Sequence, residues 1–128
     1  MEKDFDNWNE KKKKIHNRTD APYFHEREIW WCALGVNIGF EQNGHGDEYL
    51  RPAIILKGMS RQTCFVVPLT ASLSKHVLRP SVGVVDGKEA RALLSQMRLI
   101  DSKRLAKKIG YLNKDIFEQI KKAAKDTF

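Results

Sequence analysis

Two polar side chains flank predicted strands in this sequence, where together they could hold a phosphate group. Arg51 opens a strand predicted over residues 52–57, and Thr70 follows a strand predicted over residues 63–69. Residues 58–62 form the turn between these strands, which predicts a hairpin. A fork-shaped guanidinium and a hydroxyl at the ends of adjacent strands can both hydrogen-bond one phosphate. Without further information, a surface arginine and a turn threonine are the simpler interpretation.

Two polar loops lie beside these strands and supply further candidates. Residues 35–50 form a glycine-rich loop between strands, and residues 72–80 form a second loop. Loops of about 15 residues in a small domain are usually functional or disordered. The loop side chains that could contact a ligand are Glu41, Gln42, His45, Ser72 and His76. Glu41, His45 and His76 could each accept a proton, and the sequence does not rank them.

The sequence contains no motif that is typical of a metal site or of a nucleotide-binding loop. The histidines at 16, 25, 45 and 76 have no i, i+4 pairing and no carboxylate at ligand spacing. No Gly-Lys-Ser/Thr follows the glycines, and no Gly-x-Ser-x-Gly is present. We therefore expect no metal and no cofactor.

Composition indicates a single soluble domain with a basic end. The chain has 128 residues, 41% of them hydrophobic, and a net charge of +7. Residues 98–128 carry nine basic and four acidic side chains, including Arg98, Lys103 and Arg104. This excess fits a polyanion partner or a solvated face. No apolar run is long enough for a membrane span and no secretory signal is present, so we expect a cytoplasmic protein without membrane contact, its two cysteines buried and reduced.

The predicted elements are a helix, a set of short strands and a closing helix. Apolar spacing predicts a helix over residues 4–17, capped by Asp4 or Asp6. Strands are predicted over residues 28–34, 52–57, 63–69, 82–85 and 92–100, with a turn at residues 86–87. Pro68 suggests a bulge or an unpaired edge. Asn113 caps the last helix. The order predicts an α+β fold, mainly β, with a small curved sheet or half-open barrel.

Three segments, in order, resemble the PemK/MazF family of toxins. They are REIWWCALGVNIGFEQNGHGDEYLRPAIIL, VVPLTASLSK and LLSQMRLIDSKRL. The resemblance covers about residues 26–125 and implies an SH3-like, bent antiparallel barrel with a C-terminal helix. It divides the chain into an N-terminal helix and linker, residues 1–25, and a toxin domain, residues 26–128.

The resemblance implies a metal-independent endoribonuclease from a type II toxin–antitoxin module. Such an enzyme works as a cytoplasmic homodimer, is bound by an antitoxin, and cleaves single-stranded RNA by attack of the RNA's own 2′-hydroxyl. By motif, Arg51 and Thr70 are the expected catalytic residues. The residues expected to bind RNA or support the site are Glu41, Gln42, His45, Ser72, His76, Gln96 and Arg98.

The sequence departs from the Kid branch of this family at positions that carry acid–base roles there. Phe40 stands where that branch has a histidine, and Leu93 and Ser95 stand where it has an arginine and an aspartate. His45 could supply the missing imidazole or could simply face solvent. Two other functions stay open on the same fold: a gyrase-poisoning toxin, and a non-catalytic module that binds nucleic acid, DNA included.

Overall fold

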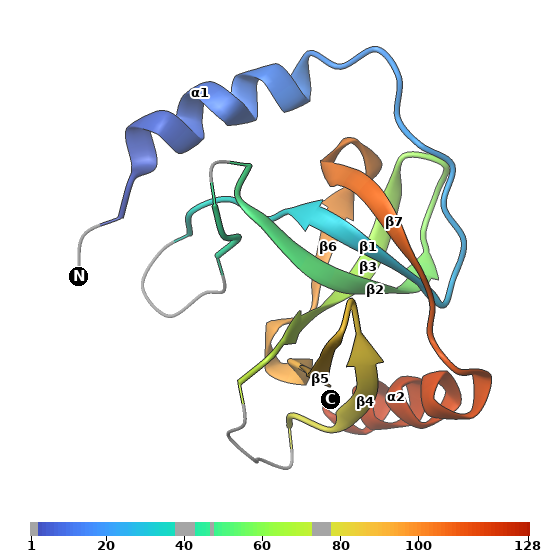
Figure 1. The fold of residues 1–128 in the computed structure, drawn as a ribbon. Coiled ribbons are helices and arrows are strands. Elements are labelled where there is room, and N and C mark those ends of the chain that lie inside the picture. The colour runs from blue at the N-terminus through green and yellow to red at the C-terminus, as the bar shows by residue number, and fades with distance from the viewer. Residues whose placement is uncertain (1–2, 38–42, 47, 73–77) are drawn as a thin grey trace.

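The computed structural model describes residues 3–37, 43–46, 48–72 and 78–128. The elements, coloured along the chain in Figure 1, are α1 (Phe5–His16), β1 (Glu28–Ala33), β2 (Leu50–Gly58), β3 (Thr63–Thr70), β4 (Ser81–Val85), β5 (Lys88–Ala92), η1 (Leu94–Gln96), β6 (Arg98–Asp101), η2 (Ser102–Arg104), β7 (Leu105–Tyr111) and α2 (Lys114–Asp126). Neither α1 nor α2, the α-helices of the described residues, is long and apolar enough to cross a membrane.

The strands form one strongly bent antiparallel sheet. Its order is β4-β5-β3-β2-β1-β7, and β6 pairs with β3 beside β5. The first part of β3 pairs with β6 and its last two residues pair with β5, so the sheet folds over at this strand. Pro68, where the sequence suggested a bulge or an unpaired edge, lies between those two pairings, and its carbonyl accepts from the N–H of Leu93 at 2.8 Å. The expected fold, a mainly β small bent barrel with a C-terminal helix and an N-terminal helical extension, is confirmed.

Both faces of the central strands are buried, which accounts for their nearly continuous apolar sequences. Alternate residues of a strand point to opposite faces. Ile54 and Val67 belong to a cluster that Phe117 and Ile120 of α2 cover. Their neighbours Ile55 and Val66 belong to a second cluster. The sheet is thereby held rigidly from both sides, so that side chains at strand ends are fixed in place.

The two helices differ in how much of their surface they bury. Asn113 caps α2 as expected, accepting from two backbone N–H groups of the first turn. Asp4 caps α1 by accepting from the N–H of Asn7. Only Trp8 of α1 is buried, and Phe5 from the same predicted stripe is 47% exposed. Trp8 is therefore the one side chain of α1 that is buried against the rest of the domain.

The prediction of one strand over residues 92–100 is wrong. A one-turn helix, η1, interrupts this segment, so that β5 ends at Ala92 and β6 begins at Arg98. The apolar residues Leu93 and Leu94 are buried inside the bend and not in a ladder. Strands β5 and β7 were not predicted, because their polar sequences KEARA and LAKKIGY lack a clear alternation.

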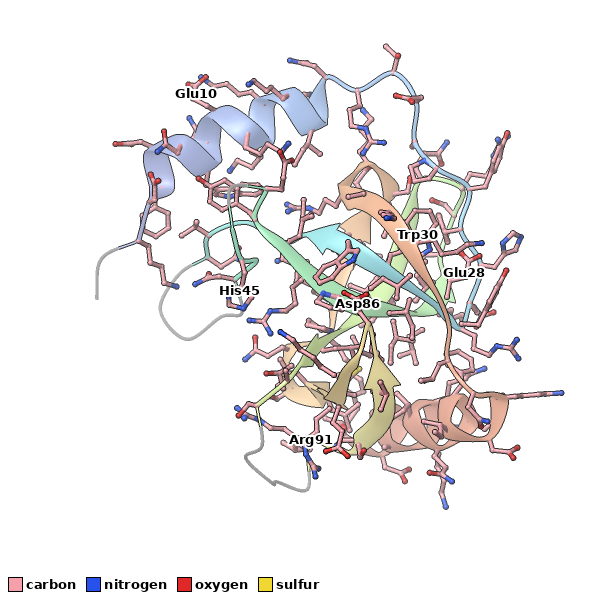
Figure 2. The ribbon with its side chains drawn as sticks, viewed as in Figure 1. Glu10, Glu28, Trp30, His45, Asp86 and Arg91 are labelled. Carbon is pink, nitrogen blue, oxygen red and sulfur yellow. The ribbon has the colours of Figure 1, made fainter. Side chains whose placement is uncertain are left out.

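Glu28 is a buried carboxylate that fixes the start of β1 (Figure 2). It accepts from the backbone N–H of His25 at 2.7 Å, from the indole N–H of Trp30 at 3.1 Å and from Lys108 at 3.3 Å. Burial alone would raise the pKa of Glu28, but these hydrogen bonds outweigh it and the pKa lies below the ordinary 4.5. The carboxylate therefore stabilises the fold above about pH 4.5, and this contribution is lost as the pH falls through the lowered pKa.

Replacing Glu28 by alanine should lower the free energy of unfolding by about 2–4 kcal/mol at pH 7, because buried donors lose their acceptor. Urea unfolding measures this change. Glu26→Ala is the matched control: Glu26 is half-exposed and lies 4.0 Å from Lys121, so its loss should cost under about 1 kcal/mol. Equal effects of the two substitutions would contradict this role for Glu28.

Candidate functional site

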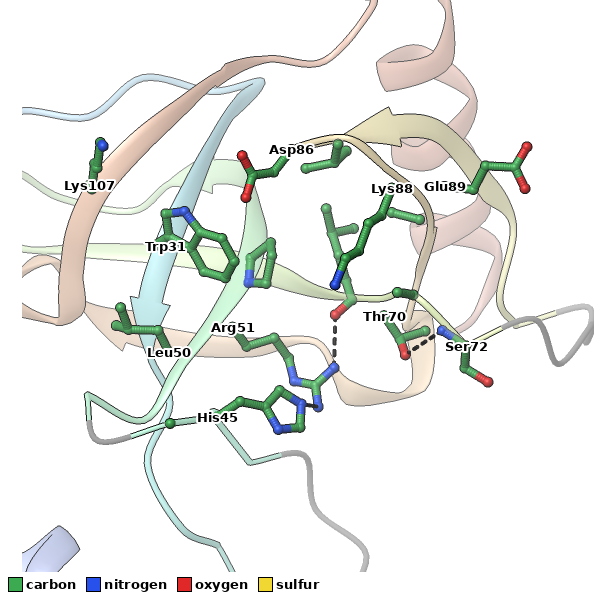
Figure 3. Close-up of a pocket in the computed structure, with 16 residues that line it drawn as sticks. Trp31, His45, Leu50, Arg51, Thr70, Ser72, Asp86, Lys88, Glu89 and Lys107 are labelled. Carbon is green, nitrogen blue, oxygen red and sulfur yellow. Dashed lines mark hydrogen bonds between the residues drawn. The ribbon is translucent and has the colours of Figure 1, made fainter.

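A pocket of about 760 Å³ lies where the β1–β2 connection meets the β4–β5 hairpin (Figure 3). Strands β1, β2, β3, β5 and β7 all contribute side chains to it. The turn at Asp86 and Gly87 closes one side, with positive φ at both residues, as in the tight hairpin turns that such sequences favour. The pocket thus forms at the point where the bent sheet brings distant strand ends together.

Arg51 lines this pocket and is only 7% exposed. Its Nε–H donates to the carbonyl of Asn43 at 2.8 Å, and an Nη1–H donates to the carbonyl of Leu69 at 2.9 Å. Burial lowers the pKa of Arg51 from 12.5. No carboxylate of the described residues forms an ion pair with it. Its further N–H groups can donate to a bound anion.

His45 is an exposed residue whose imidazole nevertheless lies against the guanidinium of Arg51. Its Nε2 lies 2.8 Å from Nη2 of Arg51. Because a guanidinium can only donate, Nε2 is the acceptor and carries no proton. Burial first, and the Arg51 charge second, lower the pKa of His45 below 6.5. The imidazole is therefore neutral at neutral pH, and its basic lone pair accepts the hydrogen bond from Arg51.

The backbone around His45 explains how a loop residue reaches this position. His45 and Leu50 exchange two backbone hydrogen bonds of 2.7 and 2.9 Å, forming an isolated antiparallel bridge. Gly46 has a φ of +72°, and its carbonyl accepts from Tyr49 to close the turn. The bridge places His45 opposite the residue that precedes Arg51, so both side chains enter the same pocket.

A hydroxyl and an ammonium group lie beside these two side chains in the polar part of the lining. The hydroxyl oxygen of Thr70 accepts from the backbone N–H of Ser72 at 3.2 Å, which fixes its orientation and leaves its proton able to donate. Figure 3 shows the Lys88 side chain pointing towards Arg51 and Thr70, whereas the carboxylate of Glu89 points away from them. Two cations and a hydroxyl thus converge on one volume.

The structure brings together four of the residues proposed from sequence and separates two others. Arg51, Thr70, His45 and Ser72 line the pocket. Gln96 and Arg98 instead line another hollow of about 480 Å³, on η1 and the start of β6. Glu41, Gln42 and His76 lie outside the described residues.

Sequence analysis missed Trp31, Asp86, Lys88 and Lys107 as lining residues. Lys88 and Lys107 belong to the two strands that were not predicted. The Asp86–Gly87 dipeptide is typical of a hairpin turn. If a second strand had been assigned directly after this turn, β5 would have been predicted.

The basic C-terminal quarter does not form one continuous binding face. Lys107 lines the pocket, but Lys108 binds Glu28. Lys103 donates to the carbonyl of His16, and Arg104 donates to the carbonyl of Ala33. Much of the local charge excess is therefore used to hold the fold together.

In the part of the chain that the structure describes, we find neither a reactive thiolate nor a group of metal ligands. Cys32 and Cys64 are free and buried, as expected, and burial raises their pKa values to about 12 and about 11. Neither can act as a thiolate near neutral pH. Among the described residues, no group of three His, Cys, Asp or Glu side chains could hold a metal ion.

Comparison with known proteins gives a family and a shared fold. The family described as PemK-like, MazF-like toxin of type II toxin-antitoxin system matches residues 25–128. MazF from Deinococcus radiodurans has a TM-score of 0.68 at 16% identity, over 83% of this chain and 96% of that one. A mycobacterial endoribonuclease has a TM-score of 0.60 at 14% identity, over 84% and 90% of the chains.

A mycobacterial endoribonuclease in complex with its cognate antitoxin has a TM-score of 0.58 at 14% identity, over 83% of this chain and 93% of that one. No curated protein matches the chain by sequence. At these identities the solved structures establish the shared fold.

Replacing Arg51 by methionine should raise the pKa of His45, because it removes the neighbouring positive charge. The rise should stop short of the ordinary value, since burial is the larger cause of the lowering. NMR titration of the imidazole signals measures the shift. Arg91→Met is the control, because Arg91 donates to the carbonyl of Arg79 and does not line the pocket. An unchanged His45 pKa in Arg51→Met would show that the two side chains are not in contact.

Proposed function

Because the chain belongs to the PemK-like, MazF-like toxins of type II toxin–antitoxin systems, we propose that it is an endoribonuclease that cleaves single-stranded RNA in the pocket around Arg51. The observation that carries this proposal is a buried guanidinium without a carboxylate partner among the described residues, beside a neutral imidazole. A phosphodiester supplies the negative charge that such a cation lacks, and a 2′-hydroxyl supplies a proton for the imidazole.

The roles of the side chains follow from the charge that develops during cleavage. Attack of the 2′-oxygen on phosphorus builds negative charge on the phosphoryl oxygens. Arg51, already fixed by two carbonyls, can donate to these oxygens without reorganising. The Thr70 hydroxyl and the Lys88 ammonium can contact the same group. These three groups together form the proposed anion-stabilising set.

His45 is the proposed proton acceptor. When RNA binds, the imidazole gives up its hydrogen bond from Nη2 of Arg51. The freed Nε2 lone pair then takes the proton of the 2′-hydroxyl as the bond from the 2′-oxygen to phosphorus forms. The bond from phosphorus to the 5′-oxygen breaks, and water returns a proton to that oxygen. The products are a 2′,3′-cyclic phosphate and a 5′-hydroxyl, and no metal takes part. A lowered pKa keeps His45 ready to accept at neutral pH.

Single-stranded RNA suits this geometry better than a duplex. The 2′-oxygen must swing into line with the leaving 5′-oxygen, which base-paired A-form geometry opposes. The pocket also exposes Trp31 beside the polar groups, and an aromatic face can stack on an unpaired base.

We also propose two partners from family membership. A cognate antitoxin would bind the toxin, as the antitoxin of the mycobacterial endoribonuclease does in its complex. The second partner is another copy of the chain, with which it would form a homodimer. The homodimer stays a prediction. The division of the chain after residue 25 and the location in the cytoplasm also stay predictions.

The purified chain should cut a mixed-sequence single-stranded RNA in the presence of EDTA, leaving cyclic phosphate and 5′-hydroxyl ends. Replacing the 2′-hydroxyl by hydrogen at the mapped cleavage position should abolish cutting while binding is retained. Arg51→Ala should reduce the rate by about 10²-fold or more, and Thr70→Val by a similar or smaller factor. Mass spectrometry and end-labelling of the products provide the measurement.

Arg91→Ala is the matched arginine control and should cut at the parental rate. Arg51→Ala should be assayed at a temperature below the midpoint of its thermal unfolding. The substitution leaves two buried carbonyls without a donor and therefore lowers the stability of the protein. Cutting of the deoxy substrate, or loss of cutting on chelation, would overturn the mechanism. Binding of RNA without cutting would favour the non-catalytic module, and poisoning of gyrase without cutting would favour the other toxin class.

An antitoxin segment should compete with RNA for the pocket. The lining carries Arg51, Lys88 and Lys107, so an acidic, disordered segment that folds on binding is the expected inhibitor. Fluorescence anisotropy of labelled RNA should fall as a peptide from the antitoxin is added. Unchanged RNA binding at saturating peptide would show that inhibition acts elsewhere.

A further inference from the structure

We propose that helix α1 is a clamp that holds the described segments of the β1–β2 connection, and through them His45 and Arg51, in their observed positions. Trp8 is the positioning residue of this clamp. The contact of α1 with the connection is observed in the structure, whereas its consequence for RNA cleavage rests on the proposed function. In Figure 1, α1 lies alongside this connection, far from α2.

Trp8 is buried against the base of the connection. It is 5% exposed and is the buried residue of α1. A Cβ placed on Gly35 would lie 2.0 Å from the Trp8 ring, so the ring occupies the space that any larger residue would fill. The ring also packs on Tyr49, with centroids 5.2 Å apart, and on the guanidinium of Arg104 at 5.9 Å.

Trp8 covers a point where the two arms of the connection touch backbone to backbone. The carbonyl of Tyr49 accepts from the N–H groups of Leu34 and Gly35 at 3.1 and 3.3 Å. The N–H of Gly44 donates to the carbonyl of Gly35 at 2.8 Å, and a Cβ on Gly44 would lie 1.6 Å from the Tyr49 carbonyl. Tyr49 has a φ of +57°, a strained value for a side-chain-bearing residue. Such a conformation persists only where surrounding contacts hold it.

These contacts lead directly to the proposed catalytic groups. Gly44 precedes His45, and Tyr49 is two residues before Arg51. The carbonyl of Asn43 accepts from Nε of Arg51. The side-chain oxygen of Asn43 accepts from Asn37 at 2.7 Å and from Lys3, just before α1, at 3.5 Å. The acceptor that orients Arg51 is therefore tied to the N-terminal segment.

Polar contacts anchor α1 at both ends. Just before its start, Lys3 also donates to the carbonyl of Asn37. In the middle of the helix, Lys11 pairs with Glu48 of the connection. Just after its end, Arg18 donates to the carbonyls of Lys103 and Leu105 at 2.6 and 3.3 Å. The ion pair between Lys11 and Glu48 contributes under about 1 kcal/mol to the docking of α1. The buried Trp8 ring is therefore the main anchor.

The test compares Trp8→Ala and Trp8→Phe with Phe5→Ala, a half-exposed aromatic on the same helix that serves as the matched control. Amide hydrogen exchange reads the connection directly. In Trp8→Ala the amides of Gly44, His45 and Leu50 should exchange about tenfold faster or more, while those of Ile54 and Val67 in the central strands keep their protection. Trp8→Phe should restore much of the protection, and Phe5→Ala should change none of it.

A second readout is the pKa of His45 by NMR titration, which needs no RNA. Among the described residues, the charged groups that line the pocket with His45 are Arg51, Asp86, Lys88, Glu89 and Lys107. Charged groups that contact the described parts of the β1–β2 connection include Lys3, Lys11 and Glu48. None of them is altered in Trp8→Ala. Release of the clamp should therefore raise the pKa of His45 towards 6.5, because burial and the contact with Arg51 are both lost.

For RNA cleavage, Trp8→Ala should lower kcat by about tenfold or more, with a smaller change in KM, since misplaced groups slow the chemical step. Exchange and titration results like those of the parent protein would overturn the clamp, whatever the RNA assay shows. Faster exchange throughout β2 and β3 would also overturn it, because Trp8 would then be part of the general core. Expected shifts in exchange and pKa, in a protein that cuts no RNA, would support the clamp and refute the proposed function.

Discussion

The buried guanidinium of Arg51 is the constraint on which the rest of the site depends. A cation that is 7% exposed loses most of its hydration, and that loss costs free energy unless fixed polar groups replace the water. Here the carbonyls of Asn43 and Leu69 and the lone pair of His45 replace it, with no carboxylate partner among the described residues. These three acceptors are neutral, so they solvate the cation without cancelling its charge.

This requirement explains why distant segments meet at one place. Leu69 comes from β3, whose path is fixed by ladders to β2, β5 and β6. Asn43 and His45 come from the β1–β2 connection, whose base is packed against α1 through Trp8. A rigid strand and a clamped connection therefore provide the acceptors from opposite sides. Displacement of either one would leave part of the guanidinium without a partner.

Sequence alone predicted the parts of the fold that depend on local pattern. The cap at Asn113 and the hairpin of β2 and β3 follow from residue type and spacing, which also limited the cap of α1 to Asp4 or Asp6. Strands β5 and β7 were not predicted from the sequence, because their lysines and arginines are exposed or paired through tertiary contacts. Arg51 and Thr70, proposed from the motif, both line the pocket, whereas Lys88 reaches it from β5, a strand that was not predicted. The contact between His45 and Arg51 depends on a loop conformation that no local pattern encodes.

The central claim, that Arg51 receives the scissile phosphate, is tested most directly by ¹H–¹⁵N NMR of the arginine Nε–H groups. The protein is titrated with an oligoribonucleotide that carries one 2′-deoxy nucleotide at the mapped cleavage position and so cannot be cut. The Nε–H signal of Arg51 should shift on binding, together with the imidazole signals of His45, while the Nε–H signal of Arg91 stays in place. Saturable binding that leaves the Arg51 and His45 signals unmoved would contradict the account.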